Sequence, residues 1–220
     1  MQLLGYFRSS TSYRLRIALN LKGLAYDYVP VNLTRGEQRA PDFVARDPFA
    51  SIPLLAAGGR DRAQSMAQLE WLEEAYPEPP LLPADIEDRF TTRELAYAIA
   101  TETHAPNNLQ VLNYLKAEFG ASQDQVQAWY RHWLNRTSAP IEARLAQHNS
   151  SDFLLGAPGL FEVVLLPQVY NAERFALDFA PYPRIRRIAE ACSRIDAFER
   201  AHPDNQIDNP DFLGQERAAS

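Results

Sequence analysis

A proline-rich stretch from Tyr76 to Pro83 divides the sequence into two parts. Four of its eight residues are proline. Proline lacks a backbone N–H group and disfavours the helical conformation in the residue before it, so this stretch cannot form a helix or a central strand. Before it, apolar runs of strand length alternate with helical patterns, and after it apolar residues recur at helical spacing throughout. We therefore predict a linker here, with a different kind of domain on each side.

The residues before the linker predict a small α/β domain. Apolar runs of strand length begin near Leu3, Tyr26 and Leu54, and Gly58-Gly59 predicts a hairpin turn after the third run. Helical patterns separate or follow these runs, so the order of elements is β-α-β-α-β-β-α. This order favours a mixed sheet with helices packed against it. We expect the domain to span residues 1–80.

The residues after the linker predict helices only. Apolar residues keep a helical period, and prolines at Pro140 and Pro167 fall inside such patterns. Each of these prolines is expected to kink or end its helix, because it removes a helical hydrogen bond and clashes with the preceding turn. We expect an all-α domain over residues 85–212 and a polar tail over residues 213–220.

Charge and cysteine content exclude several classes of function. The chain has 22 Lys and Arg against 28 Asp and Glu, a net charge of −6, which argues against broad binding to nucleic acid or to an anionic membrane. No stretch approaches the roughly 18 apolar residues of a spanning helix, and Met1 opens no basic and apolar leader. The single cysteine, Cys192, excludes an intrachain disulfide and a multi-cysteine metal site. We expect a cytoplasmic protein without a metal centre.

The segment from Phe7 to Gly23 is the strongest candidate for chemistry. A short strand leads past Arg8 into four consecutive hydroxyl residues and then directly into a helix; these residues are Ser9, Ser10, Thr11 and Ser12. Unpaired backbone N–H groups and the positive end of the helix dipole meet there, so a hydroxyl can help to bind a phosphate, a carboxylate or a thiolate. The alternative is that one of the serines only caps the helix.

A second helix start lies at Gln64 and Ser65. Ser65 and Gln68 have the spacing of a capping box, and the helix is expected to run from there. Upstream, Pro53 stands just before an apolar strand. It marks either an ordinary strand start or a cis peptide bond in a tight turn.

Together these pieces resemble the cytosolic glutathione transferases and, within them, the zeta class with its maleylacetoacetate and maleylpyruvate isomerases. Two runs are specific to this class: S-S-T-S-Y-R-L-R-I-A-L, which begins at Ser9, and P-Q-V-Y-N-A-E-R-F, which ends at Phe175. Ile52-Pro53 and Gln64-Ser65 are general to the superfamily. The resemblance implies a thioredoxin-like N-terminal domain with a mixed four-stranded sheet, an all-helical C-terminal domain and a homodimer.

The resemblance also implies roles for individual residues. Glutathione would be the cofactor, its thiolate held by Ser9 with support from Ser10 and Thr11. The rest of glutathione would contact five residues: Ile52, a cis Pro53, Gln64, Ser65 and His104. A small dicarboxylate substrate would be bound by two cations and two amides, which are Arg8, Arg174, Asn107 and Asn108.

The implied activity is glutathione-dependent cis–trans isomerisation of maleylpyruvate or maleylacetoacetate to the fumaryl isomer, as in aromatic catabolism. Thr11 stands where maleylacetoacetate isomerases usually have cysteine, which favours maleylpyruvate. Leu109-Gln110, however, replace an expected basic residue of the maleylpyruvate branch. Two alternatives remain open: a general glutathione transferase or dehalogenase of small α-halo acids, and a non-catalytic binding protein of the same fold.

Overall fold

The computed structural model describes residues 1–148 and 152–212. These residues form two compact units. One contains Met1–Leu81 together with the segment from Ser193 onward, and the other contains Leu82–Cys192. The tail expected at residues 213–220 lies outside the described residues.

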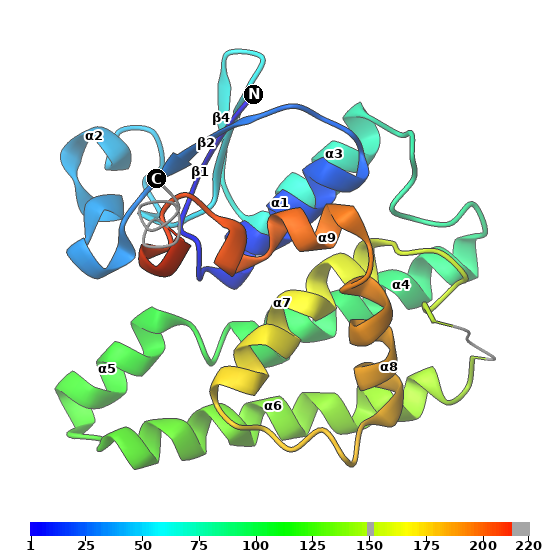
Figure 1. The fold of residues 1–220 in the computed structure, drawn as a ribbon. Coiled ribbons are helices and arrows are strands. Elements are labelled where there is room, and N and C mark those ends of the chain that lie inside the picture. The colour runs from blue at the N-terminus through cyan, green and yellow to red at the C-terminus, as the bar shows by residue number, and fades with distance from the viewer. Residues whose placement is uncertain (149–151, 213–220) are drawn as a thin grey trace. The chain divides into compact units, whose positions relative to one another are not determined.

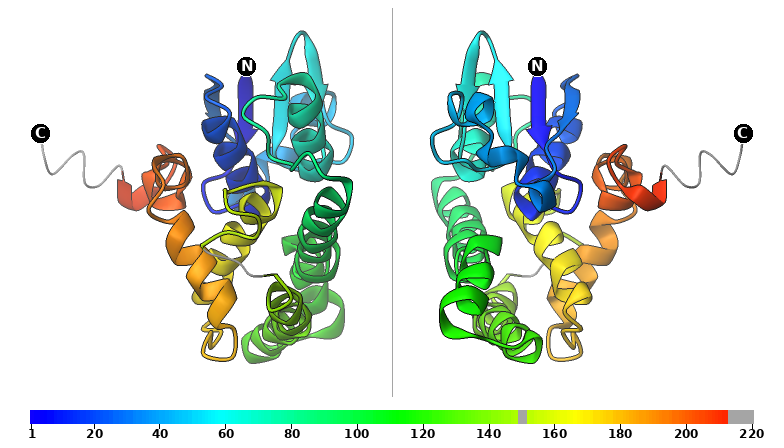
Figure 2. Two further views of the ribbon diagram at one scale, coloured as in Figure 1. Left: turned by 90° about the vertical axis from the view of Figure 1, so that its right-hand side faces the viewer. Right: turned by 90° about the vertical axis from the view of Figure 1, so that its left-hand side faces the viewer.

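A mixed four-stranded sheet forms the centre of the first unit (Figure 1). Its strand order is β2-β1-β3-β4, with β1 at Gln2–Gly5, β2 at Asp27–Pro30, β3 at Leu54–Ala57 and β4 at Arg60–Arg62. Strands β1 and β2 are parallel, whereas β3 is antiparallel to both β1 and β4. Figure 2 shows the β3–β4 hairpin in cyan beside β1 in dark blue. The predicted mixed sheet is confirmed.

The sheet of the first unit is covered by short and long helices. On one face, Leu4 and Leu54 pack with Phe43 of α2 (Pro41–Val44). Successive strand residues point to opposite faces, so Leu3 and Leu55 face the other side, and both are fully buried. Two longer helices, α1 (Ser10–Leu21) and α3 (Ser65–Ala75), pack against each other in this unit.

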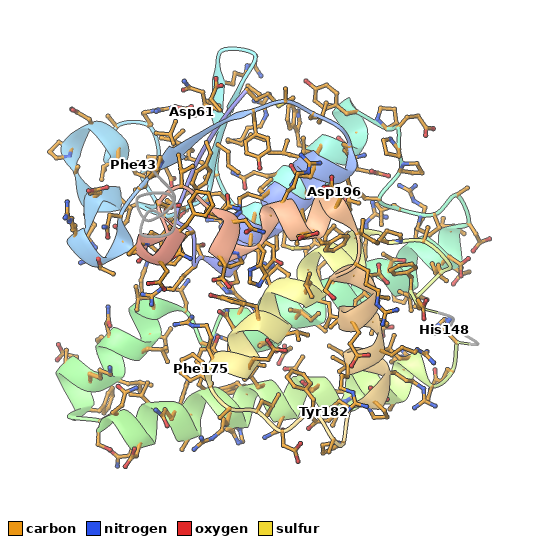
Figure 3. The ribbon with its side chains drawn as sticks, viewed as in Figure 1. Phe43, Asp61, His148, Phe175, Tyr182 and Asp196 are labelled. Carbon is orange, nitrogen blue, oxygen red and sulfur yellow. The ribbon has the colours of Figure 1, made fainter. Side chains whose placement is uncertain are left out.

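A C-terminal helix, α9 (Asp196–Ala201), packs along α1 in the first unit (Figure 1). Asn20 Nδ2 donates a 2.9 Å hydrogen bond to the carbonyl of Ala197. Arg16 Nε donates another of 2.9 Å to the carbonyl of Ala201. Asp196, which begins the helix, is labelled in Figure 3. The C-terminal segment thus supplies acceptors for polar side chains of α1.

The residues after α9 also belong to the first unit. Asp208 Oδ2 accepts a 2.9 Å hydrogen bond from the backbone N–H of Phe7 and lies 3.3 Å from the hydroxyl of Tyr28. The structure therefore differs from the predicted all-α domain of residues 85–212, because the segment from Ser193 is grouped with the sheet unit. The bonds that hold it there join residues far apart in the sequence, and no local pattern reveals them.

Every regular element in the described residues of the second unit is a helix. Its helices are α4 (Ile86–Ala98), a π-helical turn (Ile99–His104), α5 (Leu109–Phe119), α6 (Gln123–Leu145), α7 (Leu160–Arg174) and α8 (Pro183–Cys192). Pro140 and Pro167 lie inside α6 and α7, and neither ends its helix. Buried residues on both sides of each proline, such as Leu134 and Ile141 in α6, favour a continuous helix over the loss of one hydrogen bond.

Candidate active site

The N-terminus of α1 carries the predicted run of hydroxyl residues. Ser9 is the N-cap, and its Oγ accepts a 3.2 Å hydrogen bond from the backbone N–H of Ser12. Its Oγ also lies 2.9 Å from Oγ1 of Thr11, and Thr11 Oγ1 donates to the carbonyl of Ile52 at 3.0 Å. Because the Thr11 hydrogen is engaged by Ile52, the hydrogen between the two hydroxyls belongs to Ser9. The three groups form one relay, which ends at a backbone carbonyl.

The neighbours of this relay divide into exposed and buried groups. Arg8 is exposed, with its guanidinium carbon 5.4 Å from the centre of the Phe7 ring. Ser10 is buried. Ser12 is fully buried against Gly5, where a Cβ would come within 2.9 Å of Ser12 Oγ. Ser12 therefore fixes the junction of β1 and α1, and only glycine fits at position 5.

The peptide bond between Ile52 and Pro53 is cis, as the resemblance implies. The Ile52 carbonyl accepts from Thr11, so this loop is tied to the start of α1. The next carbonyl, that of Pro53, accepts a 2.9 Å hydrogen bond from Gln68 Nε2. The cis bond therefore lies between the two helix starts of the first unit and is held by a side chain from each.

The N-terminus of α3 is built differently. Ser65 is its first residue and Gln64 is its N-cap, with no side-chain cap hydrogen bond. The predicted capping box of Ser65 and Gln68 is wrong: Gln68 Nε2 donates instead to the carbonyls of Pro53 and Arg62, at 2.9 and 2.6 Å. Gln64 has a φ of 66°, a left-handed conformation that is costly for a residue with a side chain. The first N–H groups of α3 are thus left without a side-chain acceptor.

A buried arginine stands behind this helix start. Arg14, in α1, is 1% exposed, and its Nη1 lies 3.4 Å from Ser65 Oγ and 4.0 Å from Met66 Sδ. Its Nε and Nη2 have no hydrogen-bond partner in residues 1–148 and 152–212. Burial lowers the pKa of the Arg14 guanidinium to about 10. Sequence reasoning did not select Arg14, although it lies inside the class-specific run.

In the helical unit, His104 and the two predicted asparagines lie close together in the chain. His104 ends the π-helical turn and is half-buried. Asn107 is buried, and its Nδ2 donates a 3.3 Å hydrogen bond to the carbonyl of Tyr130 in α6. Asn108 caps α5, accepting a 3.0 Å hydrogen bond from the N–H of Gln110. Both amides therefore have structural partners within this unit.

Arg174 is the last residue of α7 and is exposed, with its guanidinium carbon 5.8 Å from the ring centre of Tyr170. The next residue, Phe175, stacks on Tyr130 of α6, with ring centres 3.7 Å apart and planes 2° apart. Burial raises the pKa of Tyr130 to about 12, and the positive charge of Arg174 opposes this shift. Tyr130 was not selected from the sequence. It contacts both regions, because its carbonyl accepts from Asn107 and its hydroxyl lies in the field of Arg174.

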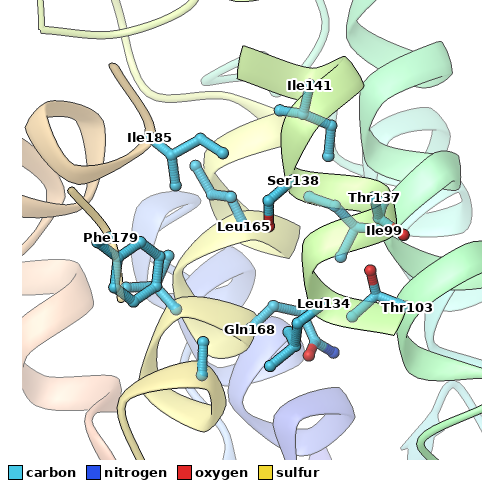
Figure 4. Close-up of a pocket in the computed structure, with 12 residues that line it drawn as sticks. Ile99, Thr103, Leu134, Thr137, Ser138, Ile141, Leu165, Gln168, Phe179 and Ile185 are labelled. Atoms are coloured by element: carbon cyan, nitrogen blue, oxygen red, sulfur yellow. The ribbon is translucent and has the colours of Figure 1, made fainter. Parts of the chain in front are cut away.

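A small cavity lies inside the helical unit between α6, α7 and the π-helical turn (Figure 4). Its volume is about 20 Å³, which is room for a water molecule and too little for a dicarboxylate or a peptide. Its lining is mostly apolar, with Gln168 and the hydroxyls of Thr103, Thr137 and Ser138. It is therefore too small to be a substrate site.

Other candidate chemistry is sparse in the described part of the chain. Residues 1–148 and 152–212 contain no group of three or more His, Cys, Asp and Glu side chains arranged to hold a metal ion. Cys192 is buried, and burial raises the pKa of its thiol. Within the same residues, every helix is too short or too polar to span a bilayer.

Known proteins match almost the whole chain. A family model described as the glutathione S-transferase N-terminal domain matches residues 8–75. A probable maleylacetoacetate isomerase from Vibrio cholerae is 42% identical over 209 residues, covering 94% of this chain and 97% of the relative. The match thus extends through both units.

Two solved structures have the same fold. The holo structure of a bacterial zeta-class maleylpyruvate isomerase superposes with a TM-score of 0.93 at 42% identity, covering 95% of this chain and all of the other. A maleylacetoacetate isomerase from Methylobacterium extorquens AM1, solved with malonate and glutathione bound, gives a TM-score of 0.91 at 34% identity, with 96% and 100% coverage.

Proposed function

Because the chain belongs to the zeta class of the glutathione S-transferases, with the maleylacetoacetate and maleylpyruvate isomerases, we propose that it is a glutathione-dependent isomerase of small maleyl dicarboxylates. The observation that carries the proposal is the pair of helix N-termini in the first unit, one with the Ser9 hydroxyl and one uncapped at Gln64 and Ser65. A thiolate and a carboxylate are the two anionic groups of glutathione that such ends suit.

The residues of the first unit fit glutathione. The uncapped start of α3 offers N–H groups and the Ser65 hydroxyl to the γ-glutamyl carboxylate. The extended segment at Ile52, beside the cis Pro53, offers backbone groups to the cysteinyl part. His104, in the helical unit, is proposed for the glycyl carboxylate.

When bound, glutathione supplies a thiolate that adds reversibly to the maleyl double bond, which permits rotation about that bond before the thiolate leaves. Ser9 stabilises the ionised sulfur by turning its hydroxyl hydrogen away from Thr11 and donating to the sulfur. Ser10 and Thr11 support this arrangement, Thr11 through its bond to the Ile52 carbonyl. No net redox change or hydrolysis occurs.

Cations orient the substrate and oppose the negative charge that develops on its conjugated carbonyl. Arg8 and Arg174, both exposed, are proposed for the two carboxylates. Asn107 and Asn108 are proposed as polar partners. The amide N–H groups are the atoms suited to this role, since they donate, and Asn107 Nδ2 already donates one hydrogen bond to the carbonyl of Tyr130. Maleylpyruvate and maleylacetoacetate are the two candidate substrates, and aromatic catabolism in the cytoplasm is the proposed setting.

The decisive experiment mixes the purified protein with maleylpyruvate, and separately with maleylacetoacetate, with and without glutathione. We expect conversion to the fumaryl isomer only when glutathione is present. Absence of turnover with both substrates would reject the isomerase. In that case, activity on a small α-halo acid that survives Arg174→Ala would support the transferase or dehalogenase alternative, because that reaction shares the thiolate but needs no second carboxylate contact.

A homodimer is also part of the proposal. On α4, Ile86 and Phe90 are four residues apart on one helical face, and they are 74% and 62% exposed. Tyr97 continues the same face. An exposed apolar face of this kind marks a protein interface. Light scattering is expected to give twice the 24.9 kDa chain mass, and Phe90→Glu is expected to give a monomer.

A further inference from the structure

Tyr130 of α6 contacts two segments that carry residues proposed for the substrate. Its ring lies face to face with that of Phe175, with ring centres 3.7 Å apart and planes 2° apart. Its carbonyl accepts the 3.3 Å hydrogen bond from Asn107 Nδ2. Tyr130 is buried in the same apolar cluster as Val126 and Leu134, which lie one turn away on either side along α6. One buried residue of a 23-residue helix therefore contacts both segments.

The last turn of α7 needs contacts of this kind to keep its conformation. Phe175 follows Arg174 directly, and the chain then turns at Ala176, whose φ of 52° is left-handed and costly for a residue with a side chain. The N–H groups of Phe175 and Leu177 both donate to the carbonyl of Ala172, at 3.1 and 2.9 Å. Glycine is the usual residue where a helix ends in this way, so the turn with alanine persists because its surroundings fix it.

The Tyr130 hydroxyl also contacts α7. It forms a hydrogen bond with the side chain of Asn171, which lies one turn before Arg174 and Phe175. Burial raises the pKa of Tyr130 to about 12. The hydroxyl therefore stays protonated at neutral pH and cannot serve as a base. The role open to Tyr130 is to fix the place of other groups.

We propose that Tyr130 is a positioning residue for the dicarboxylate substrate. Its ring fixes the last turn of α7, from which Arg174 extends, and its carbonyl binds Asn107, so it sets the spacing between two groups proposed to contact the substrate. A small error in such spacing is costly, because both groups must meet one ligand at the same time. This inference rests on the proposed function, which supplies that ligand.

Steady-state kinetics of two Tyr130 variants test this role. Tyr130→Leu is expected to lower kcat/KM for the maleyl substrate about tenfold, mainly through KM, with the Kd of glutathione within about twofold of wild type. Tyr130→Phe keeps the ring and is expected to retain kcat/KM within about threefold of wild type. The matched control is Val126→Ala, which removes buried contacts from the same cluster but leaves the stacked rings in place. Equal losses of kcat/KM in Tyr130→Leu and Val126→Ala would overturn the inference.

Phe175→Leu removes the stacked pair from its other side, and it replaces Tyr130→Leu if that variant does not fold. It is expected to raise KM in the same way. Because both substitutions remove one shared interaction, the double variant is expected to lose no more than the larger of the two single losses. Losses that add fully in the double variant would contradict a common action on Arg174.

Hydrogen exchange of the ligand-free protein gives an independent test. Tyr130→Leu is expected to speed exchange at the N–H groups of Phe175 and Leu177 about tenfold, because their hydrogen bonds lie in the turn that the ring fixes. Exchange at Leu165, a buried residue of the same helix, is expected to rise less than about threefold. An equal rise at all three residues would show a general loss of stability and would contradict the inference.

The two kinds of test separate this inference from the proposed function. Failure of the wild-type protein to isomerise either maleyl substrate would reject the proposed function. The exchange rates would still decide whether Tyr130 fixes the end of α7, because they require no ligand.

Discussion

The N-termini of α1 and α3 are two helix ends in one unit with opposite states. The end of α1 is satisfied: Ser9 caps it, and the relay from Ser9 through Thr11 to Ile52 uses the hydrogens of both hydroxyls in it. The end of α3 is not satisfied, since it has no side-chain cap, and Nε and Nη2 of Arg14 behind it have no hydrogen-bond partner in the described residues. An end that is satisfied can bind a ligand only by exchanging bonds, whereas an unsatisfied end gains bonds.

This difference assigns separate tasks to the two helix ends. The end of α3 is suited to a group with a permanent charge, and it contributes to affinity. The end of α1 is suited to a group that changes its charge during the reaction, because the Ser9 hydrogen can move between Thr11 and the sulfur. We therefore expect substitutions at α1 to change kcat and those at α3 to change Kd.

The largest effect is expected for Ser9→Ala. Loss of the hydroxyl donor should lower kcat by about a hundredfold, raise the pKa of the bound thiol and leave the Kd of glutathione within about threefold. Ser9→Thr, which keeps a hydroxyl and the cap, is the matched control. Steady-state kinetics and thiolate absorbance across pH measure both quantities. An unchanged kcat would contradict the division of tasks.

Gln64→Gly is expected to act on affinity and stability in opposite directions. Glycine adopts a φ of 66° without strain, so the free energy of unfolding should rise by about 1 kcal/mol. Loss of the amide should weaken glutathione binding by about tenfold, with kcat at saturation little changed. Calorimetry and denaturant unfolding measure the two effects, and Gln64→Asn is the control that keeps the amide. A loss in kcat as large as that of Ser9→Ala would show that the N-terminus of α3 also acts on the chemical step, and would contradict the division of tasks between the two helix N-termini.

A smaller effect is expected for Thr11→Val. This change removes the acceptor that engages the Ser9 hydrogen, so the pKa of the bound thiol should fall by up to about one unit. It also leaves the Ile52 carbonyl without its donor, at a cost of about 1 kcal/mol in stability. Thr11→Ser keeps both bonds and should behave like the wild type. If instead the thiol pKa rises in Thr11→Val, Thr11 itself is a donor to the sulfur.

The smallest effect concerns Asp208, which supports the α1 end through the Phe7 N–H. Burial raises the pKa of this carboxyl, although the Phe7 N–H, Arg16 and Tyr28 oppose the shift. Between the ordinary carboxyl pKa near 4 and the raised value, the folded protein holds more protons than the unfolded chain. Stability is therefore expected to fall as pH rises through this window.

Asp208→Asn is the variant that tests this pH dependence. The amide oxygen can still accept from Phe7, and the side chain no longer titrates. Denaturant unfolding at several pH values from 4 upward should show a flatter profile in Asp208→Asn than in the wild type. An unchanged profile would show that another group titrates in this range.

Local patterns were sufficient to predict the elements and the hydroxyl-rich start of α1. Strand β3 begins at Leu54, where the third apolar run was predicted to begin, and the mixed sheet followed from the order of elements. The capping box at Ser65 was predicted wrongly because Gln68 has a stronger use, donating to two carbonyls that only the folded chain brings within reach. Spacing shows which residues are able to pair, and the folded structure decides which pairs form.

The sequence did not reveal the residues whose importance depends on the partners they meet in the buried interior. Arg14 and Arg16 are two positions apart and have the same side chain, yet Arg16 donates to two backbone carbonyls, whereas Arg14 Nη1 makes long contacts to Ser65 Oγ and Met66 Sδ. Tyr130 was missed for the same reason, since its stacking on Phe175 joins residues of α6 and the end of α7. Chemical type alone does not distinguish such residues, because their partners come from distant parts of the chain.

The bond between Phe7 and Asp208 bears on how the protein is made. It joins residues 201 positions apart, and the whole helical unit lies between them in the sequence. During synthesis, the whole of Leu82–Cys192 is made before Asp208 is added to the chain. The sheet unit, although its first residues are translated first, therefore completes its packing last. Until the C-terminal segment has been made, Arg16 and the Phe7 N–H lack the acceptors that this segment supplies.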